Sequence, residues 1–388
     1  MDIGGVEKSL LSLLYEIPEG KYDVTLLLLN KKGLFLKHVP KWIKIEEVPW
    51  YKEINPIIMQ SPQKTINDYY TQKKYMELLS FFSTYLISKY FNSRYFYYQQ
   101  ILKSVPINKM KYDVAIAFQG PTDIIDFYIA NKVEATKKIS WVHFDVSKHL
   151  INEKLYEKLY KKYQKIFVVS KEAKEKLSNK IPGVQQKAEI FHNIISKQSI
   201  KEMAQEKVEF DPTFKGIKIV TVGRLSKEKG QDIAIKVLSR LIKDGYNVKW
   251  YCIGDGLNRK AFQDLIEKLN VQNKFVLLGQ KENPYPYIAN SDIYVQPSRH
   301  EGFCLTLAEA RCLHKPIVST NFTGAKEQIT DNYDGFIVNA SEQELYEKVS
   351  YLINHPEKSL KFITNLKKEK INTTGESKKI IDFIDIVG

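Results

Sequence analysis

The chain has 388 residues and a formal net charge of +14 at pH 7. Because single hydrophobic cores stop growing near roughly 250 to 300 residues, this length predicts two domains, and the average content of apolar and charged residues excludes a disordered or fibrous chain. The positive charge indicates an anionic partner, such as nucleic acid, an acidic lipid surface or a phosphorylated substrate.

Cysteine content and hydropathy indicate the compartment. Cys252, Cys304 and Cys312 have no paired metal-ligand spacing, which disfavours a disulfide framework or a zinc site. No run approaches the roughly 20 apolar residues of a spanning helix, and the N-terminus lacks a signal pattern. We therefore expect a cytoplasmic protein that is neither secreted nor transmembrane.

The first half contains short runs rich in β-forming residues. They lack the strict polar alternation of a half-exposed sheet, which is typical of buried parallel strands. Together they predict an α/β domain over residues 1–195. The runs cover residues 21–30, 111–120, 137–144 and 165–170.

The segment from Tyr69 to Lys103 combines many aromatic residues with several lysines. Aromatic and lysine side chains together suit a membrane interface. Aromatic residues that pack the core on two helices would give the same composition. The sequence leaves both interpretations open.

The second half repeats a regular alternation of strands and helices. Between its first two strands, Ala234, Val237, Leu238 and Leu241 recur at i, i+3, i+4 and i+7 before Asp244, which predicts an amphipathic crossover helix. We expect a second parallel sheet in a domain over residues 196–371, with the connection near 197–214 and a C-terminal helix, 372–388, rejoining the first domain. The predicted strands cover residues 216–225, 246–256, 274–279, 291–298 and 315–320.

Two carboxylates, Glu301 and Glu309, stand in the run RHEGFCLTLAEA that follows one of these strands. If a helix begins just past Gly302, Glu301 lies in the entering loop and both acids can reach one ligand. The free N–H groups at the start of that helix would bind a phosphate. These groups belong to Phe303, Cys304 and Leu305. An ordinary loop acid and a solvated helix acid would explain the pair without any function.

The run TVGRLSKEKG puts Gly223, Arg224 and Lys229 in the loop that leaves the first strand of the second sheet. Ligands bind at the carboxyl ends of such strands. The planar fork of an arginine and the compact charge of a lysine suit a pyrophosphate whose charge grows as it departs. Each cation alone is more often a solvated surface residue.

Taken together, these motifs resemble glycosyltransferase family 4, and the resemblance extends over nearly the whole length. The E-x7-E pattern is Glu301 to Glu309, the G-R-x4-K loop is Gly223 to Lys229, and the glycine-rich N-terminal loop is Gly4-Gly5-Val6-Glu7. His143 matches the interdomain histidine. The resemblance implies the α/β fold called GT-B, with two Rossmann-like domains facing across a cleft. It also implies a retaining hexosyltransferase that uses a nucleotide-sugar, with a UDP-sugar favoured.

The family also implies roles for these residues. Glu309 would bind the donor ribose, Glu301 would hold hydroxyls of the transferred sugar, and Arg224 and Lys229 would bind the diphosphate. His143 would contact the donor sugar or shape the acceptor side. The expected catalytic residues are Glu301, His143, Arg224 and Lys229, and the expected donor-binding residues are Gly5, Gly223, Arg224, Lys229, Gly254, Phe303, Cys304, Leu305 and Glu309.

Three further positions match the family less closely. Gly254 and the loop over residues 279–287 would border the nucleobase, and Asn193 matches an asparagine near the domain crossing. In residues 321–329, the run NFTGAKEQI resembles the loop after the next strand.

We expect no cofactor and no metal ion, because no D-x-D pair is placed to hold a cation between phosphates. The acceptor is expected to be a saccharide, lipid-linked and at an anionic membrane surface, as in capsular or exopolysaccharide assembly. Nucleic acid is not expected as a partner, since no recognised module accompanies the scattered cations. An NAD-dependent oxidoreductase is disfavoured because no strand is followed by a G-x-G-x-x-G fingerprint.

One alternative within the family stays open, namely a non-catalytic partner subunit of a glycosyltransferase complex. Members of the family begin with a strand that runs into the glycine-rich loop, yet here only Met1-Asp2-Ile3 precedes Gly4. The expectation is therefore a first domain without its first strand, which would leave ladder groups unpaired.

Overall fold

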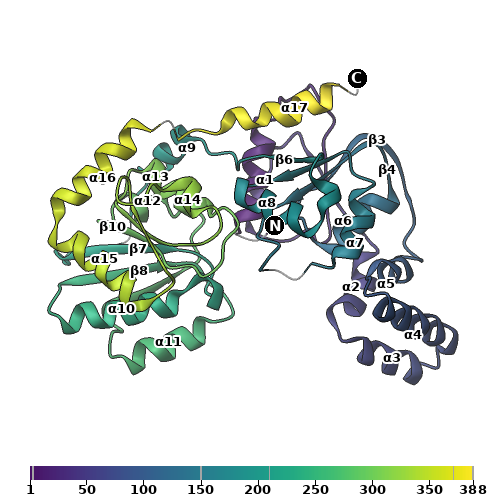
Figure 1. Ribbon diagram of the computed structural model, residues 1–388, viewed down its shortest axis with the longest axis horizontal. Coiled ribbons are helices and arrows are strands. Elements are labelled where there is room, and N and C mark those ends of the chain that lie inside the picture. Colours follow the sequence, from purple (N-terminus) through teal and green to yellow (C-terminus); the bar gives the residue numbers. More distant parts are fainter. Residues whose placement is uncertain (2–3, 149–150, 209, 370, 387–388) are drawn as a thin grey trace. The chain divides into compact units, whose positions relative to one another are not determined.

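The computed structural model describes residues 1, 4–148, 151–208, 210–369 and 371–386. Asp2 and Ile3 of the predicted leading segment lie outside this part, as do the last two residues of the predicted C-terminal helix. The chain forms two compact units (Figure 1), the first mainly from Val6–His192 and Glu376–Gly388, the second mainly from Asn193–Gly375. The boundaries predicted from the sequence, 195/196 and 371/372, lie within a few residues of these, and residues 197–214, where we expected the connection, lie within the second unit.

The first unit contains two parallel sheets. β1 pairs with β2, and a four-stranded sheet has the order β3-β4-β5-β6. The four runs expected to be strands are confirmed as β1, β3, β4 and β5, whereas β2 and β6 were not anticipated. The strands are β1 (Thr25–Leu28), β2 (Lys44–Glu47), β3 (Asn108–Ala117), β4 (Val133–Val142), β5 (Lys165–Val168) and β6 (Ala188–Ile190).

Helices surround the sheets of this unit and extend away from them at one end (Figure 1). The C-terminal helix belongs here, since Asp385 accepts from Lys21 Nζ at 2.6 Å and Lys379 Nζ donates to the Ile190 carbonyl at 2.9 Å. The helices are α1 (Gly5–Glu16), α2 (Tyr51–Met59), α3 (Pro62–Thr71), α4 (Tyr75–Tyr90), α5 (Tyr95–Ile101), α6 (Asp123–Lys132), α7 (Glu153–Tyr160), α8 (Lys171–Lys180) and α17 (Ser377–Asp385), with short 3-10 turns at Leu34–His38, Pro182–Val184 and Thr374–Glu376.

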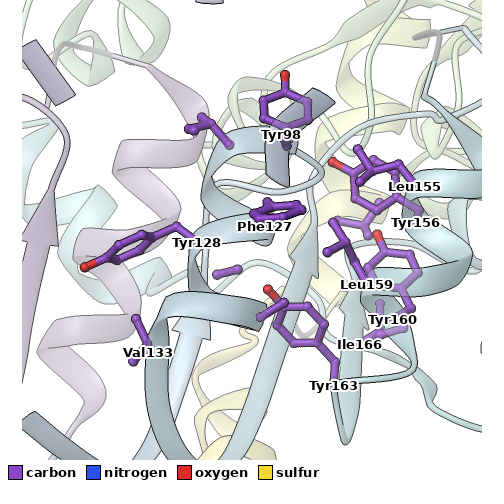
Figure 2. Close-up of a cluster of buried hydrophobic side chains, with 14 of the residues drawn as sticks. Tyr98, Phe127, Tyr128, Val133, Leu155, Tyr156, Leu159, Tyr160, Tyr163 and Ile166 are labelled. Atoms are coloured by element: carbon purple, nitrogen blue, oxygen red, sulfur yellow. The ribbon is translucent and has the colours of Figure 1, made fainter. Parts of the chain in front are cut away.

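The core of the first unit is rich in tyrosine (Figure 2). Within this core the Tyr163 hydroxyl donates to the backbone carbonyl of Asp126 at 2.8 Å. The Asp126 carboxylate, fully buried, accepts from Ser140 Oγ at 2.7 Å and from the Thr122 N–H at 2.9 Å. Burial raises the pKa of Asp126 to about 7, so the hydrogen bonds only partly offset the cost of burying its charge.

The aromatic segment from Tyr69 to Lys103 divides between the two interpretations offered for it. Phe81 and Tyr98 are buried, and Phe81 packs edge-on against Tyr69 and Tyr97, as core aromatics do. Other aromatic side chains of the same helices are exposed. These are Tyr70, Tyr75, Phe82, Tyr90 and Phe91.

The second unit is a six-stranded parallel sheet with the order β12-β11-β10-β7-β8-β9. All five predicted strands are confirmed, and β12 was not anticipated. The predicted crossover helix is confirmed as α10, with its four apolar residues fully buried. The strands are β7 (Ile217–Val222), β8 (Val248–Ile253), β9 (Phe275–Gly279), β10 (Ile293–Gln296), β11 (Ile317–Thr320) and β12 (Phe336–Val338).

Helices cover both faces of this sheet (Figure 1). α10 packs with α11 and α15, whereas α9, α12 and α13 pack with one another. The helices are α9 (Lys197–Met203), α10 (Gln231–Lys243), α11 (Arg259–Lys268), α12 (Tyr285–Ala289), α13 (Leu305–Cys312), α14 (Ala325–Gln328), α15 (Glu342–Asn354) and α16 (Pro356–Lys368), with a 3-10 turn at Lys227–Lys229. None of the helices in the described part of the chain has the length and apolar character needed to cross a bilayer.

Candidate functional site

The strand order of the second sheet reverses beside its central strand. From β7 the chain adds β8 and β9 on one side and then returns to place β10 on the other side of β7. In open parallel sheets a crevice forms at the carboxyl ends of the strands at such a reversal, because the two outgoing loops separate there. The loops that leave β7 and β10 carry the motifs singled out in the sequence.

The two loops meet through one ion pair. Lys229 Nζ lies 2.5 Å from Glu301 Oε1, although the residues are far apart in sequence. The Glu301 side chain is only 9% exposed and that of Lys229 27%, so the pair is shielded from solvent on most sides. The structure thus brings together the cation of one motif and the first acid of the other.

Polar groups at the end of β10 hold the Glu301 carboxylate in place. Ser298 Oγ donates to Glu301 Oε1 at 2.8 Å, and Gln296 Nε2 donates to Ser298 Oγ at the same distance. Gln296 is itself fixed by the Tyr294 hydroxyl, which donates to its Oε1 at 2.6 Å. Sequence reasoning did not single out Gln296 or Ser298. Their signal was the appearance of polar residues at the end of an otherwise apolar buried strand.

The charge state of Lys229 follows from its surroundings. Burial acts to lower the pKa of Lys229, but the charge and hydrogen bond of Glu301 outweigh it, and the pKa stands above its ordinary value. Lys229 therefore stays protonated at neutral pH.

A second ion pair, also missed from the sequence, ties the same two loops together. The Arg299 guanidinium donates two parallel hydrogen bonds of 2.7 Å to the Asp232 carboxylate. The backbone N–H of Arg299 donates to the backbone carbonyl of Glu228, also at 2.7 Å. Such two-pronged pairs fix direction as well as distance. They position Glu301, two residues further on, against Lys229.

Arg224 differs from Lys229 in that its side chain is exposed. Within the described residues no acid forms an ion pair with it. Its backbone lies in a tight crossing of the loops after β7 and β8, where a Cβ at Gly254 would stand 2.1 Å from the Gly223 carbonyl oxygen. Gly254, at φ +138°, is thus explained by close approach to Gly223, and its predicted role beside a nucleobase stays a prediction.

The helix with the E-x7-E motif begins later than expected. We predicted a start just past Gly302, but α13 begins at Leu305. The reason is Cys304, whose left-handed backbone (φ 65°, ψ 80°) cannot continue a helix toward its N-terminus. Of the three N–H groups expected at an anion site, that of Leu305 belongs to the first turn, whereas those of Phe303 and Cys304 precede the helix.

The first turn of α13 nevertheless stands over the reversal point. Thr306 Oγ1 lies 3.4 Å from the Val222 carbonyl oxygen at the end of β7 and 3.3 Å from Gln296 Oε1 at the end of β10. The free N–H groups of this turn and the positive end of the helix dipole therefore lie where the two loops meet.

Glu309 is 2% exposed, on the buried side of α13. Its Oε1 accepts from the Tyr285 hydroxyl at 3.3 Å. Tyr285 lies in the predicted loop over residues 279–287 and begins α12, which extends two residues past that loop. Burial excludes the interpretation of Glu309 as a solvated helix acid.

His143 directly follows β4 in the first unit. Its ring is stacked on Trp141 with an interplanar angle of 4° and lies against Phe118. Its Nε2 is buried and makes no hydrogen bond within the described part of the chain. Burial lowers the pKa of His143 to about 3, so the ring is neutral at physiological pH. A backbone hydrogen bond with Phe118 also fits a structural histidine, so the role of His143 toward a ligand stays a prediction.

Gly5 and Asn193 are the remaining candidates. Gly5 is the first residue of α1, so it begins a helix instead of lying inside a loop. Asn193 is buried, and its carbonyl accepts from Thr373 Oγ1 at 2.6 Å. Their roles toward a ligand stay predictions.

Comparison with known proteins matches residues 204–369 to the family model described as glycosyl transferases group 1. An uncharacterized glycosyltransferase of Methanocaldococcus jannaschii is 30% identical over 239 residues, covering 57% of this chain and 59% of that protein. The N-acetylgalactosamine-N,N'-diacetylbacillosaminyl-diphospho-undecaprenol 4-alpha-N-acetylgalactosaminyltransferase of Campylobacter jejuni is 31% identical over 195 residues, covering 50% of this chain and 52% of that protein. The chain thus spans little more than half the length of these relatives.

Among solved structures, HepE from Anabaena in complex with UDP and glucose aligns with a TM-score of 0.69 at 15% identity, covering 98% of this chain and 96% of that chain. The likeness extends over both units and identifies the fold as GT-B, as the sequence predicted. The predicted resemblance to glycosyltransferases is also confirmed, although these comparisons do not distinguish family 4 from group 1.

Proposed function

Starting from a GT-B chain whose second unit matches the group 1 glycosyl transferases, we propose that it is a retaining glycosyltransferase. It transfers a hexose or N-acetylhexosamine from a nucleotide-sugar, most simply a UDP-sugar, to a saccharide acceptor. The observation that carries this proposal is the Lys229–Glu301 ion pair at the reversal point of the second sheet, beneath the first turn of α13.

The ion pair suits an anion-binding site in its ligand-free state. Without ligand, Lys229 neutralises Glu301. A donor diphosphate at the start of α13 offers Lys229 a more highly charged partner, and Arg224, which is exposed, can join it. Glu301 is then released to accept hydrogen bonds from hydroxyls of the transferred sugar, while Ser298 keeps its carboxylate oriented.

The proposed chemistry needs charge stabilisation more than a protein nucleophile. In a retaining reaction of this kind, the acceptor attacks from the side of the leaving group, and a phosphate oxygen of that group takes the acceptor proton. Lys229, Arg224 and the dipole of α13 would stabilise the growing charge on the phosphate, a role for which we propose no metal ion. His143, neutral because of its lowered pKa, would serve as a hydrogen-bonding group and not as an acid.

Glu309 and the acceptor complete the proposal. Buried beside the Tyr285 hydroxyl, Glu309 has the fixed position that binding of two ribose hydroxyls would require.

For the acceptor, we favour a lipid-linked saccharide at the cytoplasmic face of a membrane, in assembly of a surface polysaccharide. The support is the Campylobacter jejuni relative, whose name gives a diphospho-undecaprenol-linked acceptor.

Donor hydrolysis across a panel of UDP- and GDP-sugars tests this function. We expect turnover with one donor, unchanged in excess EDTA, and a loss of roughly 100-fold or more in kcat for Lys229→Met, because one preorganised charge on the leaving group is removed. Lys236→Met, which changes an exposed lysine on α10, is the matched control and should behave as wild type. Failure to bind or hydrolyse any donor would instead favour the non-catalytic partner subunit, and loss of activity in EDTA would refute metal independence.

A further inference from the structure

Helix α4 presents an apolar stripe to solvent. Tyr75, Leu79, Phe82, Leu86 and Tyr90 recur at i, i+4, i+7, i+11 and i+15, so they line one side of the helix. They are 54%, 61%, 43%, 47% and 85% exposed in that order. We call these five residues the α4 stripe. Single exposed apolar residues are ordinary, but five in one row along a helix indicate a contact surface.

The stripe is separate from the side that holds α4 in the fold. Phe81 and Ser88 on the other side are buried, and α4 packs there against α3 and α5. Ser88 Oγ donates to the Ser93 carbonyl at 2.7 Å, which fixes the end of the helix. The apolar stripe is therefore not needed to anchor α4.

Positive charge lies at both ends of the stripe. Lys73 and Lys74 precede α4, Lys89 is in its last turn, and all three are exposed. The acid within α4, Glu77, stands about 160° around the helix from Leu79, away from the stripe. Over residues 51–103 the cations outnumber the acids: Lys52, Lys64, Lys73, Lys74, Lys89, Arg94 and Lys103 against Glu53, Asp68 and Glu77.

Exposed aromatic pairs extend the stripe at each end. The rings of Tyr70 and Tyr75 meet edge to face with their centroids 6.3 Å apart, and those of Tyr90 and Phe91 do so at 5.1 Å. Tyrosines with an apolar ring and a polar tip, beside lysines with long apolar stems, are the side chains that settle at the boundary between lipid headgroups and acyl chains.

We propose that the α4 stripe docks on an anionic lipid surface, with α4 lying flat in the headgroup region. The 16 residues of α4 extend about 24 Å, and the lysines at both ends would reach phosphate groups while the stripe enters the acyl boundary. A second copy of this chain fits less well, because it would bring the same lysines and a net charge of +14 against each other. The inference extends the membrane-located acceptor of the proposed function, but its test is separate because it measures lipid binding and not sugar transfer.

Vesicle flotation tests the docking with the full-length protein. Vesicles of phosphatidylglycerol and phosphatidylcholine should carry the protein at low salt, and pure phosphatidylcholine should carry much less. Leu79→Gln/Leu86→Gln should lower the partition coefficient by about tenfold or more, and Lys73→Gln/Lys74→Gln/Lys89→Gln by roughly 100-fold, since each lysine near an anionic surface contributes about a factor of five.

Matched controls come from the second unit, which offers exposed residues of the same types. Leu257→Gln/Leu360→Gln and Lys236→Gln/Lys243→Gln/Lys268→Gln change as many exposed residues and should float as wild type. Flotation that all variants share equally, or no flotation of the wild type at low salt, would overturn the proposal. So would concentration-dependent dimerisation without lipid that the stripe variant abolishes, because a second copy would then be the occupant.

A spectroscopic readout keeps the proposal testable if a stripe variant folds poorly. Cys252, Cys304 and Cys312 are buried, so a polarity-sensitive fluorophore can be attached selectively to Leu86→Cys or, as the control, to Leu257→Cys. Anionic vesicles should shift the emission of the label at position 86 to the blue and leave the label at 257 unchanged. Equal emission shifts at both positions would contradict docking through α4.

Discussion

Lys229 and Glu301 show, at the scale of single residues, how a binding site can be stable before its ligand arrives. Each side chain is largely removed from water, and each neutralises the other. Taking away one member leaves the other with its charge buried and not neutralised, which costs far more than removing both. The same pair that we propose to bind the donor therefore also stabilises the second unit.

This dependence predicts a non-additive result in a double-mutant cycle. Lys229→Met and Glu301→Gln should each lower the free energy of unfolding by about 2 kcal/mol, and the double variant should lose less than the sum of the two. Urea unfolding of the four proteins measures the coupling. Strictly additive losses would show that the ion pair contributes nothing to stability.

Asp126 supplies a prediction on pH dependence. Its pKa is raised to about 7 in the folded protein, above the ordinary value of about 3.9 in an unfolded chain, so unfolding releases a proton between these limits. The contribution of Asp126 is therefore most favourable below about pH 4 and is lost as the pH rises through 7.

Asp126→Asn removes this titration while keeping a group that can donate to Ser140 Oγ and accept from the Thr122 N–H. From pH 5 to pH 8 the wild type should lose about 2 to 3 kcal/mol of unfolding free energy relative to Asp126→Asn. Urea unfolding of both proteins at pH 5 and at pH 8 measures this difference. Parallel pH profiles for the two proteins would mean that the pKa of Asp126 is not raised.

At the scale of elements, the strands that the sequence missed share one property. β2, β6 and β12 each lie at the edge of a sheet and are only three or four residues long. The sequence of β2, KIEE, lacks the continuous apolar run by which other strands were recognised. The sequence of β12, FIV, is apolar but only three residues long, too short to stand out as a strand. The predicted start of α13 was wrong for another reason. The residue types around Cys304 do not indicate that its backbone is left-handed.

The turn that places Lys229 gives a prediction at this scale. Gly230 has φ +70°, and a Cβ there would stand 1.9 Å from the Pro297 carbonyl oxygen, which belongs to the loop leading to Glu301. Gly230→Ala should therefore force the two loops apart, destabilise the protein by about 3 kcal/mol and weaken donor binding.

Gly245→Ala is the matched control for this glycine. Gly245 has φ +86°, but its Cβ would meet nothing within 4 Å, so the change should cost only the backbone strain of about 1 kcal/mol. Thermal or urea unfolding separates the two effects. Equal losses for both variants would show that loop contact at Gly230 is unimportant.

At the scale of the whole molecule, each unit has its own hydrophobic core. One cluster lies around the β3–β6 sheet and the other around the β7–β12 sheet. Two separate cores predict that the units respond separately to a ligand that binds only one of them.

Calorimetry in the presence of UDP tests this independence. At about 100 times its dissociation constant, UDP should stabilise the second unit by about 2.7 kcal/mol and raise its unfolding temperature by several degrees, leaving the transition of the first unit in place. Lys229→Met should abolish the shift. A single transition that moves as a whole would mean that the units unfold together.

The amino-acid sequence alone was enough to predict nine of the strands in the three sheets, the crossover helix α10 and the positions of the two motif loops after β7 and β10. These features are local, because an apolar run or a periodicity of 3.6 residues reports which side of an element is buried. Three other features appear first in the folded chain: Glu301 is paired with Lys229, Glu309 is buried beside Tyr285, and one side of α4 is covered while the α4 stripe is not. A sequence pattern shows which face of an element is apolar, but what covers that face depends on segments distant in the chain.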